Sequence, residues 1–114
     1  MEQKISIYGV EVFGLACTER GGCQHYHSPL DIVSIEFKCC GAYYCCYFCH
    51  EALAGHPAQR WEMEEWDEKA VLCGACGAKL SIKEYLACNA HCPQCLSGFN
   101  PGCRNHWHFY FKML

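Results

Sequence analysis

Alternation of apolar and polar residues predicts a strand near the start of the chain. Over residues 4–13, KISIYGVEVF, apolar side chains recur at every second position, but the alternation slips by one position at Gly9. A single strand with a glycine bulge accounts for such a slip. We therefore expect one bulged strand over residues 4–13.

Two later segments show the same two-residue period. Residues 32–38, IVSIEFK, place Val33, Ile35 and Phe37 on one face and Ser34, Glu36 and Lys38 on the other. This pattern predicts a half-buried strand whose polar face meets solvent. Residues 106–112, HWHFYFK, follow a predicted tight turn at 99–102 and alternate in the same way, with aromatic side chains on one face. We expect a strand there too.

Helical spacing governs two segments. Cys46, Cys49 and His50 stand at i, i+3 and i+4, so a short helix ending at Gly55 would turn all three toward one side. The neighbours Cys49 and His50 are splayed by about 100°, which lets them reach two different metals. A second short helix is predicted after Ser81, which forms a capping box with a glutamate three residues later.

An acidic connector over residues 57–70 separates these two parts of the chain. Its acidic residues predict a solvated face. We expect Trp61 and Trp66 to anchor the connector on the rest of the protein.

Composition indicates how so short a chain can fold. With 114 residues the protein has room for one small domain and a limited core, yet it contains 13 cysteines. The first residues lack the pattern of a secretory signal, and no stretch is apolar enough to span a membrane. The cysteines occur in C-x-x-C pairs near histidines, so zinc in a reducing compartment is favoured over disulfides, and we expect a cytoplasmic location.

The clearest metal signature lies in the second half of the chain. Cys73 and Cys76 form one C-x-x-C knuckle and Cys92 and Cys95 form another, fifteen residues later. This spacing is typical of a four-cysteine structural zinc site. Cys88 lies between the knuckles at a spacing that does not suit the site.

The first half offers more ligands but a less certain grouping. Cys23 and His25, at i and i+2, can bind one metal from an extended segment. Cys45 and Cys46 are alternative partners for Cys49, and the C-x-x-C spacing favours Cys46. Cys17 lacks such spacing, so we interpret it as a packed or surface thiol.

The tail offers a possible fourth site. Cys103, His106 and His108 would supply most of it, with Cys88 or His27 as the last ligand. The alternative is that these polar groups hydrogen-bond to the sheet.

These motifs resemble the CHY-type zinc finger family over residues 23–111. The features that carry the resemblance are Cys23-x-His25-Tyr26, Cys39-Cys40, Cys46-x-x-Cys49-His50, His56 and the two knuckles. The closing FNPGCRNHWHFYF resembles the stand-alone branch, which includes helpers of small Tim proteins in fungal mitochondria and short bacterial proteins. The chain stops before the RING domain of the ubiquitin-ligase branch could fit.

The resemblance implies three zincs. It assigns the first to Cys23, His25, Cys46 and Cys49, the second to Cys39, Cys40, His50 and His56, and the third to Cys73, Cys76, Cys92 and Cys95. Because adjacent cysteines on one metal are sterically tight, a split of Cys39 and Cys40 between the first two zincs stays open. The expected fold is a small zinc-stabilised α+β domain over residues 1–114, with short strands and helices around a binuclear lobe (about 1–60) and a zinc-ribbon-like lobe (about 71–114).

Two functions fit these features. The first is a protein-interaction module with structural zincs, and the second is an accessory protein that handles zinc or thiols for clients through Cys17, Cys45, Cys88 and Cys103. We expect that the protein is not an enzyme, because each implied zinc has four protein ligands and the sequence has no H-E-x-x-H motif.

Charge and family bear on the partner and the location. Three zincs bound by nine thiolates would add a net charge of about −3 to the formal charge of −3, which gives about −6. We therefore expect a protein partner rather than nucleic acid or a membrane. The mitochondrial intermembrane space is the alternative location for a fungal chain.

Overall fold

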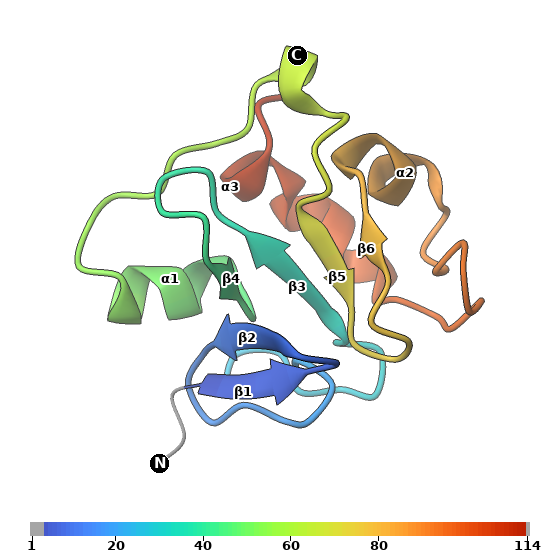
Figure 1. The fold of residues 1–114 in the computed structure, drawn as a ribbon, viewed down its shortest axis with the longest axis horizontal. Helices are drawn as coiled ribbons and strands as arrows, with labels where there is room; N and C mark the ends of the chain where they lie inside the picture. The colour runs from blue at the N-terminus through green and yellow to red at the C-terminus, as the bar shows by residue number, and fades with distance from the viewer. Residues whose placement is uncertain (1–3, 114) are drawn as a thin grey trace.

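Six short strands form one mixed sheet in the part of the chain that the computed structural model describes, residues 4–113. The strands are β1 (Lys4–Ile7), β2 (Val10–Phe13), β3 (Val33–Glu36), β4 (Tyr43–Tyr44), β5 (Val71–Cys73) and β6 (Lys79–Leu80). Their order is β1-β2-β4-β3-β5-β6 (Figure 1). Only the β2–β4 pair is parallel among these neighbours. One sheet therefore joins both predicted lobes through the β3–β5 pair.

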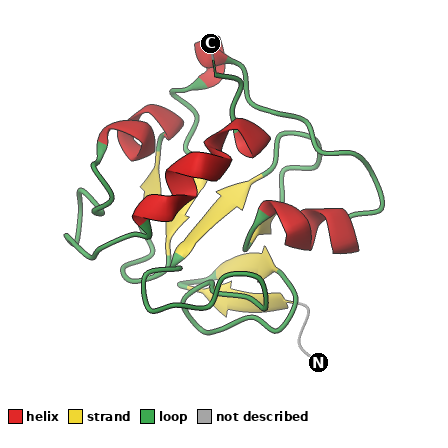
Figure 2. Ribbon diagram, turned by 180° about the vertical axis from the view of Figure 1, so that it is seen from behind, coloured by secondary structure: helices red, strands yellow, loops and turns green. Residues whose placement is uncertain are grey.

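Short helices flank this sheet. They are α1 (Tyr47–Leu53), η1 (Met63–Glu65), α2 (Ile82–Ala87), η2 (Pro101–His106) and α3 (Trp107–Tyr110). The η2–α3 segment lies behind β3, β5 and β6 in Figure 1 and in front of them in Figure 2, so it covers one face of the sheet. Large side chains are fully buried in the core, among them Phe37, Leu72, Leu80, Ile82 and Phe111. The expected α+β class is confirmed.

The bulged strand predicted over residues 4–13 is wrong, because this segment is a hairpin. β1 pairs antiparallel with β2, and Ile7 faces Val10 across a two-residue turn. The turn residues Tyr8 and Gly9 both have positive φ, 48° and 82°, as the hairpin turn that suits strand twist requires. The slip in the alternation therefore marks the turn between two strands.

The strand predicted over residues 32–38 is confirmed as β3, but its polar face is covered. Ser34 is fully buried, and a side chain on Gly21 would lie 2.9 Å from its Oγ. The loop before β3 therefore packs against the face that was expected to meet solvent. Single-strand periodicity carries no information about such a distant loop.

The strand predicted over residues 106–112 is also wrong, because the tail is helical as far as Tyr110, and only Phe111 makes a β-bridge, to Trp61. Asn100 caps η2 by accepting a hydrogen bond from the Gly102 N–H, and Pro101 follows at the first helical position. In α3 the Phe111 N–H donates to the Trp107 carbonyl. The alternation of a short aromatic run does not distinguish a strand from a helix, and here the local cap favours the helix.

Both predicted helices are present. Cys46 caps α1, and Gly55 follows its C-terminal end with φ +72°. Ser81 and Glu84 form the predicted capping box of α2. These ends are set by local chemistry, which explains why the sequence locates them.

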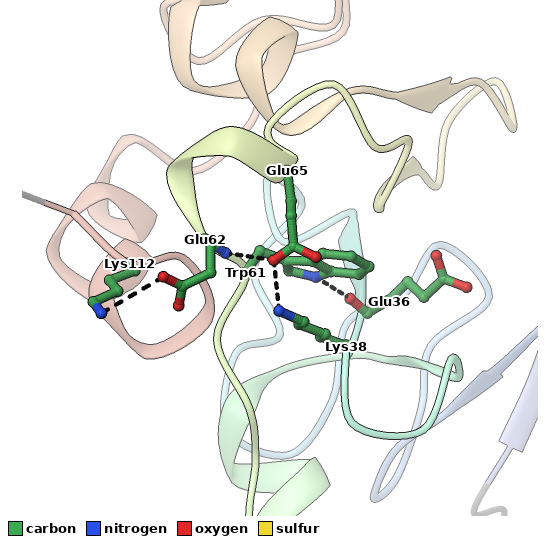
Figure 3. A network of polar contacts seen from close by, with 6 residues as sticks. All are labelled: Glu36, Lys38, Trp61, Glu62, Glu65 and Lys112. Atoms are coloured by element: carbon green, nitrogen blue, oxygen red, sulfur yellow. Dashed lines mark hydrogen bonds and ion pairs between the residues drawn. The ribbon is translucent and has the colours of Figure 1, made fainter.

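The acidic connector is held on the sheet by a polar network (Figure 3). The Trp61 indole N–H donates to the Glu36 carbonyl at 2.8 Å, and Lys38 forms an ion pair with Glu65 at 2.6 Å. Lys38 also lowers the pKa of Glu65 through this hydrogen bond. Trp61 thus anchors the connector as expected, and part of its acidic face is paired rather than free in solvent.

Candidate metal centres

The fold gathers all twelve predicted ligands into three groups of four. In each group the candidate ligand atoms lie within 4.8 Å of one another, and residues 4–113 contain three such groups. Group 1 is Cys23, His25, Cys46 and Cys49; group 2 is Cys39, Cys40, His50 and His56; group 3 is Cys73, Cys76, Cys92 and Cys95. Groups 1 and 2 combine Cys and His side chains and group 3 has four Cys, all of them ligand types that zinc prefers in proteins.

Group 1 joins the loop after β2 to the start of α1. The His25 Nδ1 atom lies 3.7, 3.4 and 3.5 Å from the sulfurs of Cys23, Cys46 and Cys49. The sulfurs of Cys23 and Cys46 are 3.7 Å apart. Tetrahedral zinc with ordinary bond lengths separates two sulfurs by about 3.8 Å and a sulfur from a nitrogen by about 3.6 Å. The geometry of group 1 therefore fits one zinc.

Backbone and thiol groups favour negative charge in group 1. The Leu15 N–H donates to the Cys49 sulfur at 3.4 Å, and the Cys49 N–H donates to the Cys46 sulfur at 3.4 Å. The contact between the Cys23 and Cys46 thiols lowers the pKa of Cys23 and raises the pKa of Cys46. Because thiols bind zinc as thiolates, a bound cation would favour the deprotonated form of all three cysteines.

Group 2 joins the turn after β3 to His50 within α1 and to His56, which lies beyond the end of that helix. The Cys39 sulfur lies 3.2 Å from His50 Nε2 and 3.9 Å from the Cys40 sulfur. His50 is fully buried and stacks on Phe37 at 4.2 Å between ring centroids. Burial lowers the pKa of His50, which keeps the imidazole in the neutral form that binds metal. Both adjacent cysteines lie in this group, so the fold does not split them.

Group 3 is built from two matching turns. The sulfurs of Cys73 and Cys95 are 3.8 Å apart, and those of Cys76 and Cys92 are also 3.8 Å apart. In each turn a backbone N–H returns to the carbonyl of the first cysteine, from Gly77 and from Leu96. Burial raises the pKa of Cys73, whereas a hydrogen bond from Ser97 lowers that of Cys95 to about 6. The four sulfurs therefore have the spacing of a zinc-thiolate tetrahedron.

The groups differ in their exposure. Cys23, Cys46 and Cys49 of group 1 are buried, as are Cys73 and Cys92 of group 3. Group 3 has one exposed ligand, Cys95, whereas group 2 has two, Cys40 and His56. Solvent and competing ligands can therefore approach group 2 most directly.

The residues suggested for a fourth zinc take other positions. His106 Nδ1 lies 3.3 Å from the Tyr26 hydroxyl, and the Cys88 thiol donates to the Tyr85 carbonyl at 3.0 Å. Burial raises the pKa of Cys103. None of the three groups includes Cys103, His106 or His108. The fourth zinc stays a prediction that a metal count can test.

Sequence reasoning missed an aromatic patch beside group 1. Phe48 is 40% exposed and lies 5.6 Å from the His25 ring, 5.6 Å from Tyr47 and 6.0 Å from Phe109 between centroids. Tyr26 stacks on the same Phe48 ring at 6.4 Å. We call Tyr26, Tyr47, Phe48 and Phe109 the aromatic patch. The hint in the sequence was the aromatic pair at 47–48, which lies between the ligands Cys46 and Cys49.

Comparison with known proteins gives one family. A family model described as CHY zinc finger matches residues 23–101. The chain is 36% identical over 104 residues to Helper of Tim protein 13 of Saccharomyces cerevisiae, covering 89% of this chain and 90% of the relative. It is 38% identical over 101 residues to Helper of Tim protein 13 of Kluyveromyces lactis, covering 89% and 88%. An uncharacterized protein of Schizosaccharomyces pombe is 37% identical over 101 residues, with the same coverage. No solved structure matches the chain significantly.

Proposed function

The chain belongs to the CHY zinc finger family, and on that premise we propose that it is a protein-interaction module whose three zincs are structural. The observation that carries the proposal is the complete set of four protein ligands at each of the three groups. Zinc with four protein ligands is usually structural, because catalysis needs an open coordination position. The proposal therefore assigns no reaction to the protein.

The partner we propose is a protein of the Tim class. Two relatives that align over most of the chain are named Helper of Tim protein 13. The negative formal charge of −3 does not favour nucleic acid. Between residues 4 and 113, no helix has the length and apolar character needed to cross a bilayer.

The aromatic patch is our candidate for the contact surface. Exposed aromatic side chains that gather on one face are enriched at protein interfaces. Phe48 is the exposed centre of this patch, and it packs directly against the His25 ring of group 1. Binding through the patch would thus depend on an intact group 1.

Binding of the zinc-loaded chain to a purified Tim-class protein tests this proposal. We expect Phe48→Ala to raise the Kd at least tenfold, about 1.4 kcal/mol, because it removes the exposed centre of the patch. Met63→Ala is the matched control, since Met63 is similarly exposed at 41% but lies on η1, far from α1 in Figure 1. No binding by the unchanged chain would refute the partner class. Equal binding by both variants would refute the surface.

The second candidate function is zinc handling, and the exposure of group 2 favours it. Exposed Cys40 and His56 offer a competing ligand a route to the metal. Under this alternative, a zinc-sensing dye would remove one zinc rapidly from the folded protein. Cys40→Ser would remove that rapid phase together with the group 2 zinc, whereas purely structural zincs would leave the unchanged protein only as it unfolds.

For the location we propose the mitochondrial intermembrane space, which suits a helper of Tim proteins better than the cytoplasm. Imaging of the tagged full-length protein in its source organism would distinguish the two compartments. A cytoplasmic signal that does not co-purify with mitochondria would overturn this assignment.

A further inference from the structure

Two cysteines outside the three metal groups lie in contact. The sulfur of Cys17, in the loop after β2, lies 3.6 Å from the sulfur of Cys45, which joins β4 to α1. Neither residue belongs to a group that gathers zinc ligands. Because β2 and β4 run parallel, with Phe13 opposite Tyr44, the segments that follow them bring the two thiols together.

Gly14 keeps room for this pair. A side-chain carbon at Gly14 would lie 2.7 Å from the Cys45 sulfur and 3.0 Å from the Cys17 sulfur. Both distances are shorter than a carbon–sulfur contact allows, so even a methyl group would push the sulfurs away. The space that the two sulfurs occupy therefore depends on glycine at this position.

The loop that carries Cys17 is held in a strained conformation. Ala16 has φ +53°, which is rare for a residue with a side chain and costs about 1 kcal/mol or more. Two hydrogen bonds hold Leu15, the residue before Ala16: its N–H donates to the Cys49 sulfur, and its carbonyl accepts from the Gln24 N–H at 2.9 Å. Such strain is concentrated at functional sites, and here it presents Cys17 to Cys45.

The two thiols differ in their access to solvent. Cys17 is partly exposed, whereas Cys45 is buried and lines a cavity of about 180 Å³ beneath α3. An exposed first thiol backed by a buried second one is the arrangement that dithiol exchange requires. The 3.6 Å contact is roughly 1.5 Å longer than a disulfide bond, so bond formation requires only a small movement of the two side chains.

We propose that Cys17 and Cys45 form a dithiol site that exchanges electrons with disulfides, separate from the three zinc groups. The Cys17 thiolate attacks one sulfur of a disulfide such as glutathione disulfide, whose S–S bond breaks and releases one glutathione thiol. The Cys45 sulfur then gives up its proton and attacks the Cys17 sulfur, which forms the Cys17–Cys45 bond and releases the second glutathione thiol. The protein loses two electrons and two protons, and the disulfide gains them.

This site goes beyond the proposed interaction role and does not depend on it. Oxidation of the pair uses no member of group 1, although Cys45 precedes Cys46 and Leu15 contacts Cys49. The zinc ligands therefore stay in place while the neighbouring dithiol changes its redox state.

The test is an oxidation series on the zinc-loaded full chain. Samples equilibrate in glutathione buffers with a rising share of glutathione disulfide, and the thiols are then alkylated and mapped by mass spectrometry. Zinc content is measured in parallel. We expect the first step to remove two alkylatable thiols, with the bond mapped to Cys17 and Cys45 and no zinc released.

Variants check the order of the two steps. Cys45→Ser should stop at a single glutathione adduct on Cys17, and Cys17→Ser should lose the two-thiol step. Cys88→Ser, a partly exposed thiol that bonds to Tyr85, is the matched control and should keep the step.

Three outcomes would overturn the proposal. They are a first disulfide that includes a zinc ligand, a first disulfide between two chains, or a Cys17–Cys45 pair that stays reduced until zinc is lost. Mapping of the unchanged chain decides the question even if a variant fails to fold.

Discussion

At the scale of single residues, the direction of a side chain decides which of two adjacent cysteines binds zinc. Cys46 lies 3.4 Å from His25 Nδ1 within group 1, whereas Cys45 turns to Cys17. We expect Cys46→Ser to lose at least one zinc, since removing one thiolate opens the site. Cys45→Ser should keep all three. Elemental analysis of both purified variants measures this, and equal zinc contents would contradict the ligand assignment.

A second residue-scale prediction concerns the matching turns of group 3. Gly77 and Leu96 follow the last cysteine of each turn and both have positive φ, +79° and +66°. A side chain at Gly77 would also lie 2.5 Å from the Tyr8 ring. Gly77→Ala should therefore lower the free energy of unfolding by about 1–2 kcal/mol.

Leu96→Gly should change the free energy of unfolding in the opposite direction. Leu96 is 74% exposed, so its removal relieves backbone strain with little loss of packing and should raise the unfolding free energy by up to about 1 kcal/mol. Denaturant unfolding of zinc-saturated protein measures both changes. The same sign for both variants would argue against strain as the cause.

At the scale of elements, the sequence located those parts whose ends are set locally. The caps of α1 and α2 lie within the helices' own sequence, at Cys46 and Ser81. The hairpin was missed because a slip in alternation fits a bulge as well as a turn. The tail was missed because seven residues of aromatic alternation cannot distinguish a strand from a helix, and because Asn100, which caps η2, was assigned to a tight turn.

The corrected tail leads to a prediction about Asn100. Its Oδ1 accepts from the Gly102 N–H at 2.8 Å, and its Nδ2 donates to Asp31 at 2.9 Å. Asn100→Ala removes both bonds and should lower the unfolding free energy by about 1–2 kcal/mol. Asn105→Ala, at an exposed position of the same η2 segment, should change it by less than about 0.5 kcal/mol. Chemical denaturation of both variants gives the comparison, and similar losses would mean that the cap contributes little.

The candidate sites, like the helices and strands, were predictable from the sequence where neighbouring residues define them and not where distant residues do. Each knuckle of group 3 is fixed by spacing within four residues, so sequence alone identified it. The Cys17–Cys45 contact joins residues 28 positions apart, and no spacing rule predicts it. The aromatic patch likewise needs α1 and α3 to meet, which a strand in the tail would not have allowed.

At the scale of the whole molecule, zinc ties together elements that are too short to fold alone. α1 has 7 residues and supplies ligands to both group 1 and group 2, while β5 has 3 residues and ends at Cys73 of group 3. Isolated helices of this length are not stable in water. We infer that the metals hold each half together internally, groups 1 and 2 in the first half and group 3 in the second, while the β3–β5 pair joins the two halves.

Removal of zinc tests this inference. A structural zinc contributes on the order of 10 kcal/mol, which is comparable to the whole stability of a small domain, so the fully metal-free chain should be largely unfolded. Because Cys40 and His56 are exposed, the zinc of group 2 should leave first under a chelator. Native mass spectrometry follows the zinc count during the titration, while circular dichroism and amide dispersion follow the fold. Loss of helical signal should accompany the loss of groups 1 and 2, since both bind through α1. A metal-free chain that kept its dispersed amide spectrum would show that the apolar core, with Phe37 and Phe111 at its centre, suffices without the metals.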